Sequence, residues 1–158
     1  MMNSLRKAAC VFLLLLVLVL SGCSTTPHGP TFSPVQHISP GKALVYFYRP
    51  NMFRGGRATF RVYVNDGLIV EMKNGGYYPL IVDPGKLRIS TKMKPTFGYV
   101  LEAIVTLGET IDIDAEAGVR YFVKVDFTKT KQLQLVPNDV GREEIEQLKL
   151  NPGYRESN

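Results

Sequence analysis

The chain has few of the residues from which catalytic and metal sites are commonly built. Its 158 residues include two cysteines, two histidines and no tryptophan. Both histidines, His28 and His37, lie in a proline-rich stretch where a general base would not be held within reach of a nucleophile. Paired cysteines, a His-Glu-x-x-His segment and a glycine-rich phosphate loop are all absent from the sequence. We therefore expect a protein that is not an enzyme and uses no cofactor.

The longest hydrophobic run is too short to cross a membrane and is followed closely by a cysteine. Residues 11–20 are unbroken VFLLLLVLVL, preceded by Arg6 and Lys7, whereas a membrane-spanning helix needs roughly 20 apolar residues. A positive start, a short apolar run and small residues after it are typical of a secretory signal peptide. The segment Leu20-Ser21-Gly22-Cys23 resembles the lipobox of bacterial lipoproteins, which implies cleavage after residue 22 and lipid attachment to Cys23.

A lipid on Cys23 would hold the protein on a membrane, since two acyl chains already anchor a protein stably. Ser24 follows the cysteine where an aspartate would imply retention at the inner membrane. The resemblance to enteric-type sorting therefore implies an outer-membrane lipoprotein, which we expect to face the periplasm, with exposure at the cell surface as the alternative. The alternative is an uncleaved helix in which Cys23 is incidental.

Charge and cysteine content narrow the class of protein further. The formal net charge of +5 falls to +3 without the signal, which holds Arg6 and Lys7 and no acidic residue. A nucleic-acid-binding domain usually concentrates more positive charge than this, so we expect no nucleic-acid partner. Cys10 would leave with the signal and Cys23 would carry lipid, so the mature domain would have no disulfide and would depend on packing alone.

Composition divides the rest of the chain into three parts. Residues 23–41 contain four prolines and little apolar periodicity, which predicts a semi-rigid tether that could reach on the order of 50 Å at about 3.1 Å per residue. Residues 42–150 are predicted to form the folded domain, and residues 151–158 a C-terminal tail.

The folded part shows the two-residue alternation of β-strands, with turn signals every eight to twelve residues. Because parallel strands need long crossovers, we expect an all-β, antiparallel β-sandwich of about eight or nine short strands. Asn65-Asp66-Gly67 predicts a tight hairpin, and residues 141–150 a C-terminal helix. The predicted strands cover residues 43–48, 59–65, 68–72, 77–82, 87–93, 99–107, 110–115, 120–127 and 131–136.

The order of several turn motifs resembles known bacterial surface domains. Four segments follow one another: ALVYFYRP at 43–50, VNDG at 64–67, NGGYY at 74–78 and VDPGK at 82–86. Their order resembles a family of bacterial lipoproteins with a domain of unknown function. It is also similar to PEGA-type domains, which are small β-sandwiches, although the Pro-Glu-Gly-Ala segment itself is absent. The resemblance covers residues 42–127 and implies an exported, mostly antiparallel β domain. It supplies no catalytic residues.

Tyrosines and arginines gather around the first two predicted strands and predict an interaction surface. Alternation places Tyr46, Tyr48 and Tyr63 opposite the residues expected in the core. Tyrosine and arginine are favoured at protein interfaces, and the same tyrosines would suit a sugar. The alternative is a docked helix that buries them. The candidate surface comprises Tyr48, Arg49, Arg54, Arg57, Arg61, Tyr63 and Tyr77.

Two charged strands offer weaker candidates. Asp112, Asp114 and Glu116 alternate along one strand and could begin a calcium site, although same-face residues on a strand are nearly 7 Å apart. A plain solvent-exposed face is the simpler interpretation. The basic residues Lys86, Arg88, Lys92 and Lys94 could pair with these acids, bind anions or lipid headgroups, or protect a sheet edge from aggregation.

These observations favour a lipid-anchored envelope protein with a non-catalytic, protein-binding or structural domain. A glycan- or peptidoglycan-binding module is the first alternative, since it would use the same tyrosines. An assembly lipoprotein of a secretion system is the second, since it would share the sandwich and the tether.

Overall fold

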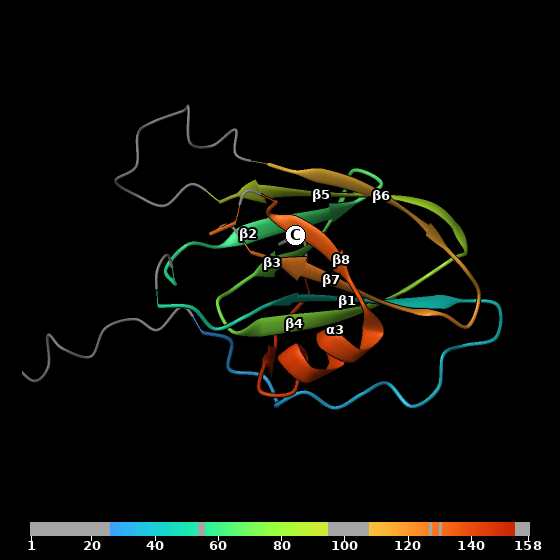
Figure 1. The fold of residues 1–158 in the computed structure, drawn as a ribbon, viewed down its shortest axis with the longest axis horizontal. Coiled ribbons are helices and arrows are strands. Elements are labelled where there is room, and N and C mark those ends of the chain that lie inside the picture. The colour runs from blue at the N-terminus through green and yellow to red at the C-terminus, as the bar shows by residue number, and fades with distance from the viewer. Residues whose placement is uncertain (1–25, 54–55, 95–107, 127, 130, 154–158) are drawn as a thin grey trace, which may run out of the picture.

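Two β-sheets packed face to face form the domain (Figure 1). The computed structural model describes residues 26–53, 56–94, 108–126, 128–129 and 131–153. Sheet A has the order β8-β7-β1-β4-β9 and sheet B the order β3-β2-β5-β6, which confirms the predicted β-sandwich. The elements are β1 (Ala43–Arg49), β2 (Phe60–Val64), β3 (Gly67–Met72), β4 (Gly76–Val82), β5 (Gly85–Met93), β6 (Thr110–Ala115), β7 (Arg120–Val125), β8 (Leu133–Val136), α3 (Asn138–Ile145) and β9 (Lys149–Leu150).

Sheet A is mixed, so the expectation of wholly antiparallel pairing is wrong at two places. Strand β1 pairs with β4 in the antiparallel sense but with β7 in the parallel sense, and β9 is parallel to β4. A parallel pair needs a long connection. Between β1 and β7 the chain supplies one, because it forms β4 of sheet A and all four strands of sheet B before it reaches β7.

Local turn chemistry agrees with the prediction, whereas the helix begins earlier than predicted. Asn65 and Asp66 have φ angles of 47° and 66°, as the tight hairpin between β2 and β3 requires. Helix α3 begins directly after Pro137, and residues 149–150 form β9 instead of its last turn. The predicted strand at 99–107 lies outside the described residues. In the described part of the chain, no helix is long and apolar enough to cross a membrane.

Strand β1 is buried on both of its faces, which gives the domain two hydrophobic clusters. Val45 and Phe47 point between the sheets into the larger cluster, with Phe60 and Val62 of β2 opposite. The other face of β1 belongs to a second cluster on the outer side of sheet A, which contains the buried residues Leu44, Tyr46, Tyr48, Tyr77, Phe122, Ile145 and Leu148.

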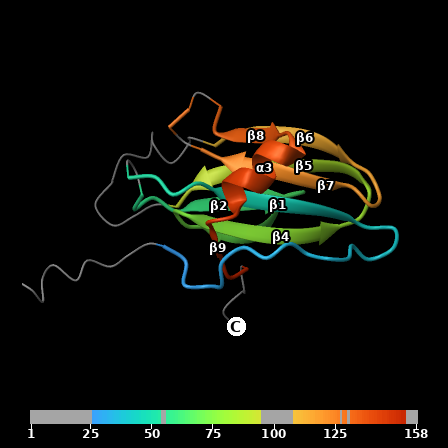
Figure 2. The same ribbon diagram turned by 60° about the horizontal axis from the view of Figure 1, so that its bottom comes forward.

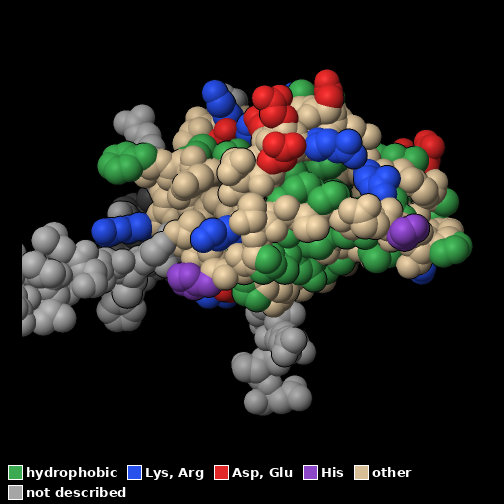
Figure 3. All heavy atoms as spheres, turned by 90° about the horizontal axis from the view of Figure 1, so that it is seen from below, with side chains coloured by type: hydrophobic (Ala, Val, Ile, Leu, Met, Phe, Trp, Pro, Cys, Tyr) green, Lys and Arg blue, Asp and Glu red, His purple; other side chains and the backbone are tan. Residues whose placement is uncertain are grey.

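The second cluster is covered by α3 and by the proline-rich segment, which run along the same side of sheet A (Figures 1 and 2). Phe32, Val35 and Ile38 are partly buried against it. The Phe32 amide donates to the Leu148 carbonyl at 2.9 Å. Hydrophobic side chains accordingly gather in the middle of this side of the molecule (Figure 3).

The packing of residues 32–38 differs from the tether predicted for residues 23–41. An extended polyproline-type chain has three residues per turn, so the three-residue spacing of Phe32, Val35 and Ile38 suits burial of one side. The part of this segment that the structure describes is attached to the domain.

Candidate functional site

The structure divides the predicted interaction surface into buried and exposed parts. Tyr48 and Arg49 have 0% of their surface exposed and Tyr77 has 4%, so the prediction that these three side chains contact a partner is wrong. Arg57 is exposed, and Arg61 and Tyr63 are half-buried. Arg54 and Cys23 lie outside the described residues, and His28 and His37 are exposed.

Arg49 has a structural role between β1 and the start of β2. Its Nη1 donates to the Ala58 carbonyl oxygen at 2.5 Å, and its guanidinium lies 5.1 Å from the centre of the Phe60 ring. Burial lowers the pKa of Arg49 to about 10, and the nearby negative charge of Asp126 opposes that shift. The Arg49 guanidinium therefore stabilises the fold and is not part of an exposed binding surface.

Tyr48 fastens helix α3 to sheet A. Its hydroxyl donates to Glu144 Oε2 at 2.5 Å, and Lys124 Nζ donates to Glu144 Oε1 at 2.7 Å. Burial raises the pKa of Tyr48 far above its usual value, with the hydrogen bond to Glu144 adding to the shift. Burial alone would raise the pKa of Glu144, but the hydrogen bonds from Lys124 and Tyr48 lower it.

Arg61 and Tyr63 instead belong to the outer face of sheet B, which points away from the core. Burial alternates along β5, where Leu87, Ile89 and Thr91 are buried between residues that point outward. In the part of the chain that the structure describes, α3 and residues 32–38 pack on sheet A, not on this face. Among the described residues, the charged side chains on this face include Arg61, Lys86, Arg88, Lys92 and Lys94 with Glu71, Asp112 and Asp114, so that basic residues outnumber acidic ones.

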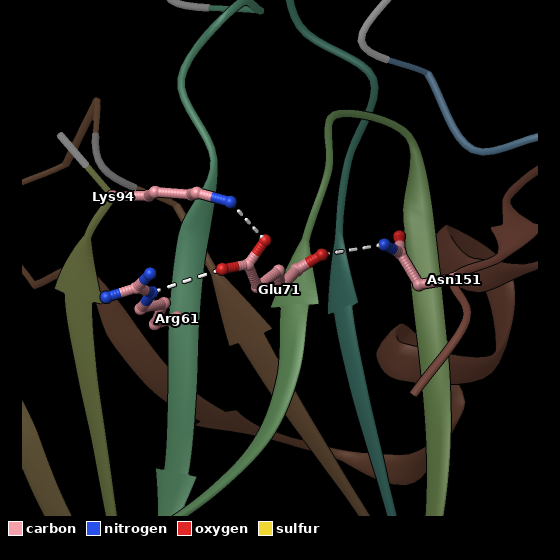
Figure 4. Close-up of polar contacts among 4 residues, drawn as sticks. All are labelled: Arg61, Glu71, Lys94 and Asn151. Carbon is pink, nitrogen blue, oxygen red and sulfur yellow. Dashed lines mark hydrogen bonds and ion pairs between the residues drawn. The ribbon is translucent and has the colours of Figure 1, made fainter. Parts of the chain in front are cut away.

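One end of this face is organised around Glu71 (Figure 4). Its carboxylate accepts from Arg61 Nε at 3.1 Å and from Lys94 Nζ at 2.6 Å. Burial alone would raise the pKa of Glu71, but the hydrogen bonds from Lys94 and Arg61 bring it below its ordinary value. Asn151 donates through Nδ2 to the Glu71 carbonyl oxygen at 2.8 Å, so the C-terminal segment fixes this edge of the sheet. The sequence prediction did not include Glu71, because its partners lie on other strands.

Among the described residues, the rest of the face carries the Tyr63 ring and the predicted cross-strand charges. Lys92 Nζ lies 5.4 Å from the centre of the Tyr63 ring. Arg88 Nε lies 3.3 Å from Asp112 Oδ1, and Lys86 is opposite Asp114 in the register of β5 and β6. These facts confirm the pairing predicted between the basic and acidic strands.

Asp112, Asp114 and Glu116 do not form the calcium site that their alternation suggested. Asp112 is paired with Arg88, and the Glu116 amide donates to the Tyr121 hydroxyl at 2.9 Å. Within residues 26–153, gaps in the description aside, no group of three histidine, cysteine, aspartate or glutamate side chains is placed to hold a metal ion. The three acids act as exposed charges along one edge of sheet B.

A groove on the opposite side of the molecule was not predicted. It lies between residues 32–36 and α3 and consists of two adjoining hollows, of about 470 and 140 Å³. Phe122, Arg120 and Arg142 border both hollows. Arg120 Nη2 is already used, because it donates to the carbonyl oxygens of Val35 and Gln36 at 3.3 Å. The groove therefore lies along the boundary between the proline-rich segment and the rest of the domain.

Comparison with known proteins gives a family but no activity. A family model described as a protein of unknown function, DUF2846, matches residues 39–136. The match covers strands β1 to β8 and ends before α3. No curated protein and no solved structure matches the chain.

Proposed function

Because the chain belongs to the DUF2846 family, whose function is unknown, we propose from its own residues that it is a lipid-anchored lipoprotein of the bacterial outer membrane. The observation that carries this proposal is the lipobox-like Leu20-Ser21-Gly22-Cys23 after a short apolar run. Cys23 takes the lipid, and the domain faces the periplasm. The likeness to lipoprotein and PEGA-type domains belongs to the same proposal.

The β-sandwich acts as a non-catalytic module that binds another envelope protein through the outer face of sheet B. The proposal is supported by a difference between the outer sides of the two sheets. The outer side of sheet A is occupied by α3 and residues 32–38, whereas that of sheet B exposes charged side chains around Tyr63. The excess of basic residues on this face suits a partner with an acidic surface, because complementary charge speeds association and excludes wrong partners.

Charge reversal on the two sides of the molecule tests this surface. Lys92→Glu places a negative charge on the outer face of sheet B, and Arg142→Glu makes the same change on α3 as a matched control. Both side chains are exposed, so each variant should keep its free energy of unfolding within about 0.5 kcal/mol. After crosslinking in intact cells, mass spectrometry should find the partner lost from Lys92→Glu and retained by Arg142→Glu. Equal crosslinking of both variants would rule this face out.

A glycan-binding module is the second candidate, favoured by the half-buried Tyr63 ring beside Lys92. Sedimentation of the purified domain with insoluble cell wall, in the absence of other proteins, would support it. An assembly role in a secretion system would instead be shown by co-purification with a defined inner-membrane component. The anchor has its own test, because metabolic palmitate labelling should mark the wild-type protein and not Cys23→Ser.

A further inference from the structure

A phenylalanine stands fully exposed in the connection between β1 and β2. Phe53 has a relative exposure of 106%, the highest among the exposed large hydrophobic residues of the described chain. Arg57, a few residues further on, is also exposed. Exposed aromatic and basic residues are also the residue types with which amphipathic helices lie in the headgroup region of a bilayer.

The base of this connection is fixed rather than loose. The Asn74 side chain donates from Nδ2 to Asn51 Oδ1 at 2.8 Å and to the Met52 carbonyl oxygen at 2.9 Å. Its Oδ1 accepts from the Met52 amide at 2.9 Å. Phe53 follows directly, so its position at this end of the sandwich is set by the turn between β3 and β4.

The N-terminal segment enters the domain at the same end. A Cβ atom placed on Gly75 would lie 3.5 Å from Thr26 Cγ2 and 3.4 Å from Asn51 Cβ, so these residues meet over the turn. The views in Figures 1 and 2 agree, with the start of the described chain beside the β1–β2 connection. Pro27 is already buried.

Chain length then limits the distance between this end and the lipid. Thr26 is three residues after Cys23, and an extended chain spans at most about 3.6 Å per residue, or about 11 Å in all. Because the described chain already lies on the domain from Thr26 onward, the anchored protein would not have a reach of tens of ångströms.

We propose that the anchored domain rests on the bilayer through the end formed by Thr26, Phe53 and Arg57, with the Phe53 ring in the interfacial layer. This inference rests on the lipid anchor proposed above and adds an orientation to it. Arg57 contacts anionic headgroups, which attract basic residues near the surface. The acyl chains supply the affinity, and Phe53 and Arg57 determine which side of the domain faces the lipid.

The absence of tryptophan from the sequence allows a direct test. Phe53→Trp introduces a single fluorescent reporter at the proposed contact. Ile81→Trp is the matched control, because Ile81 is a 48% exposed hydrophobic residue at the other end of β4, about 17 Å along the strand from Gly76. Both variants are prepared as the lipidated full chain and reconstituted into vesicles of phosphatidylethanolamine and phosphatidylglycerol.

The expected result is a shift of Phe53→Trp emission to shorter wavelength and its quenching by lipids that carry a nitroxide on the acyl chain. Ile81→Trp should show neither effect, and adding Arg57→Glu to Phe53→Trp should reduce the quenching. Equal, water-like emission from both tryptophan variants would overturn the orientation.

Vesicle flotation separates this inference from the anchor. Lipidated protein that floats while Phe53→Trp stays unquenched would leave the anchor in place and refute the membrane-facing end. Protein with an intact Cys23 that fails to float would refute the anchor itself, and the orientation with it. Flotation of the Cys23→Ser form would also count against Cys23 as the anchor.

Discussion

Replacement of Gly141 by alanine should destabilise the domain, although helix propensity alone predicts the opposite. Gly141 is buried where α3 crosses β7, and a Cβ atom there would lie 2.4 Å from both Cβ and Cγ of Phe122. Carbon atoms in contact normally lie about 3.5–4.0 Å apart. The helix must therefore move away from sheet A or the phenylalanine must leave its place.

The magnitude follows from two opposing effects. Alanine is favoured over glycine inside a helix by about 1 kcal/mol, whereas overpacking a core costs about 1–3 kcal/mol and sometimes more. The Phe122 Cβ cannot swing aside because it is fixed to the β7 backbone, and its ring is stacked on Tyr46 with centroids 5.1 Å apart. We therefore expect a packing cost at the upper end of this range, about 3 kcal/mol, which leaves a net loss of about 2 kcal/mol after the propensity gain.

Urea unfolding of the soluble domain measures this change in the free energy of unfolding. Glu143→Ala is the matched control, because Glu143 is exposed on the same helix and its replacement should change stability by less than about 0.5 kcal/mol. Stability of Gly141→Ala equal to or above that of the wild type would refute the close packing of α3 on β7. A similar loss in Glu143→Ala, at an exposed position of the helix, would show that α3 tolerates no substitution and would remove the support for a specific clash at Gly141.

Two further predictions concern Glu71 and the proline-rich segment. The pKa of Glu71 is lowered in the folded state, so its contribution to stability is present above the unfolded value of about 4.3 and is lost as pH falls through the folded value. Glu71→Gln should thus lower the urea midpoint at neutral pH, with the difference from wild type shrinking below about pH 4; a pH-independent difference would contradict this. Phe32→Ala should cost roughly 2 kcal/mol, because the ring makes edge contacts with Tyr46 and Tyr77 at 5.5 and 5.1 Å. Unchanged thermal stability would mean that the segment is a free tether.

Features that depend on neighbouring residues could be predicted from the sequence. The β2–β3 hairpin was recognisable because Asn65 and Asp66 tolerate positive φ angles and are followed by glycine. The outward position of Arg61 and Tyr63 follows from two-residue alternation, which holds wherever one face of a strand is buried. The pairing of Arg88 with Asp112 needed only that β5 and β6 be neighbours in the sheet.

The burial of Tyr46 and Tyr48 depends on residues that are far away in the sequence. Alternation in β1 shows which residues share a face, but it does not distinguish a face in water from one covered by a second layer. That layer comes from Phe32 and Val35 on one side of β1 in the sequence and from Ile145 about a hundred residues later. The Tyr46 hydroxyl accepts from the Val35 amide at 2.8 Å, and the Tyr48 hydroxyl bonds Glu144. Each buried hydroxyl thus has a polar partner, which removes the cost that would otherwise keep it at the surface.

The proposed orientation also bears on which partner can reach the outer face of sheet B. Strand β1 ends at Arg49, near the end that carries Thr26, so the strands would stand away from the bilayer and sheet B would face sideways. Arg61 lies near the start of β2 and is paired in register with Lys92, which places this basic pair close to the lipid, with Lys86 further out. A partner held in the same membrane would meet the near end first, whereas a soluble partner would meet either end equally. Lys92→Glu should then weaken crosslinking more than Lys86→Glu if the partner is membrane-bound, and equal losses would indicate a soluble one.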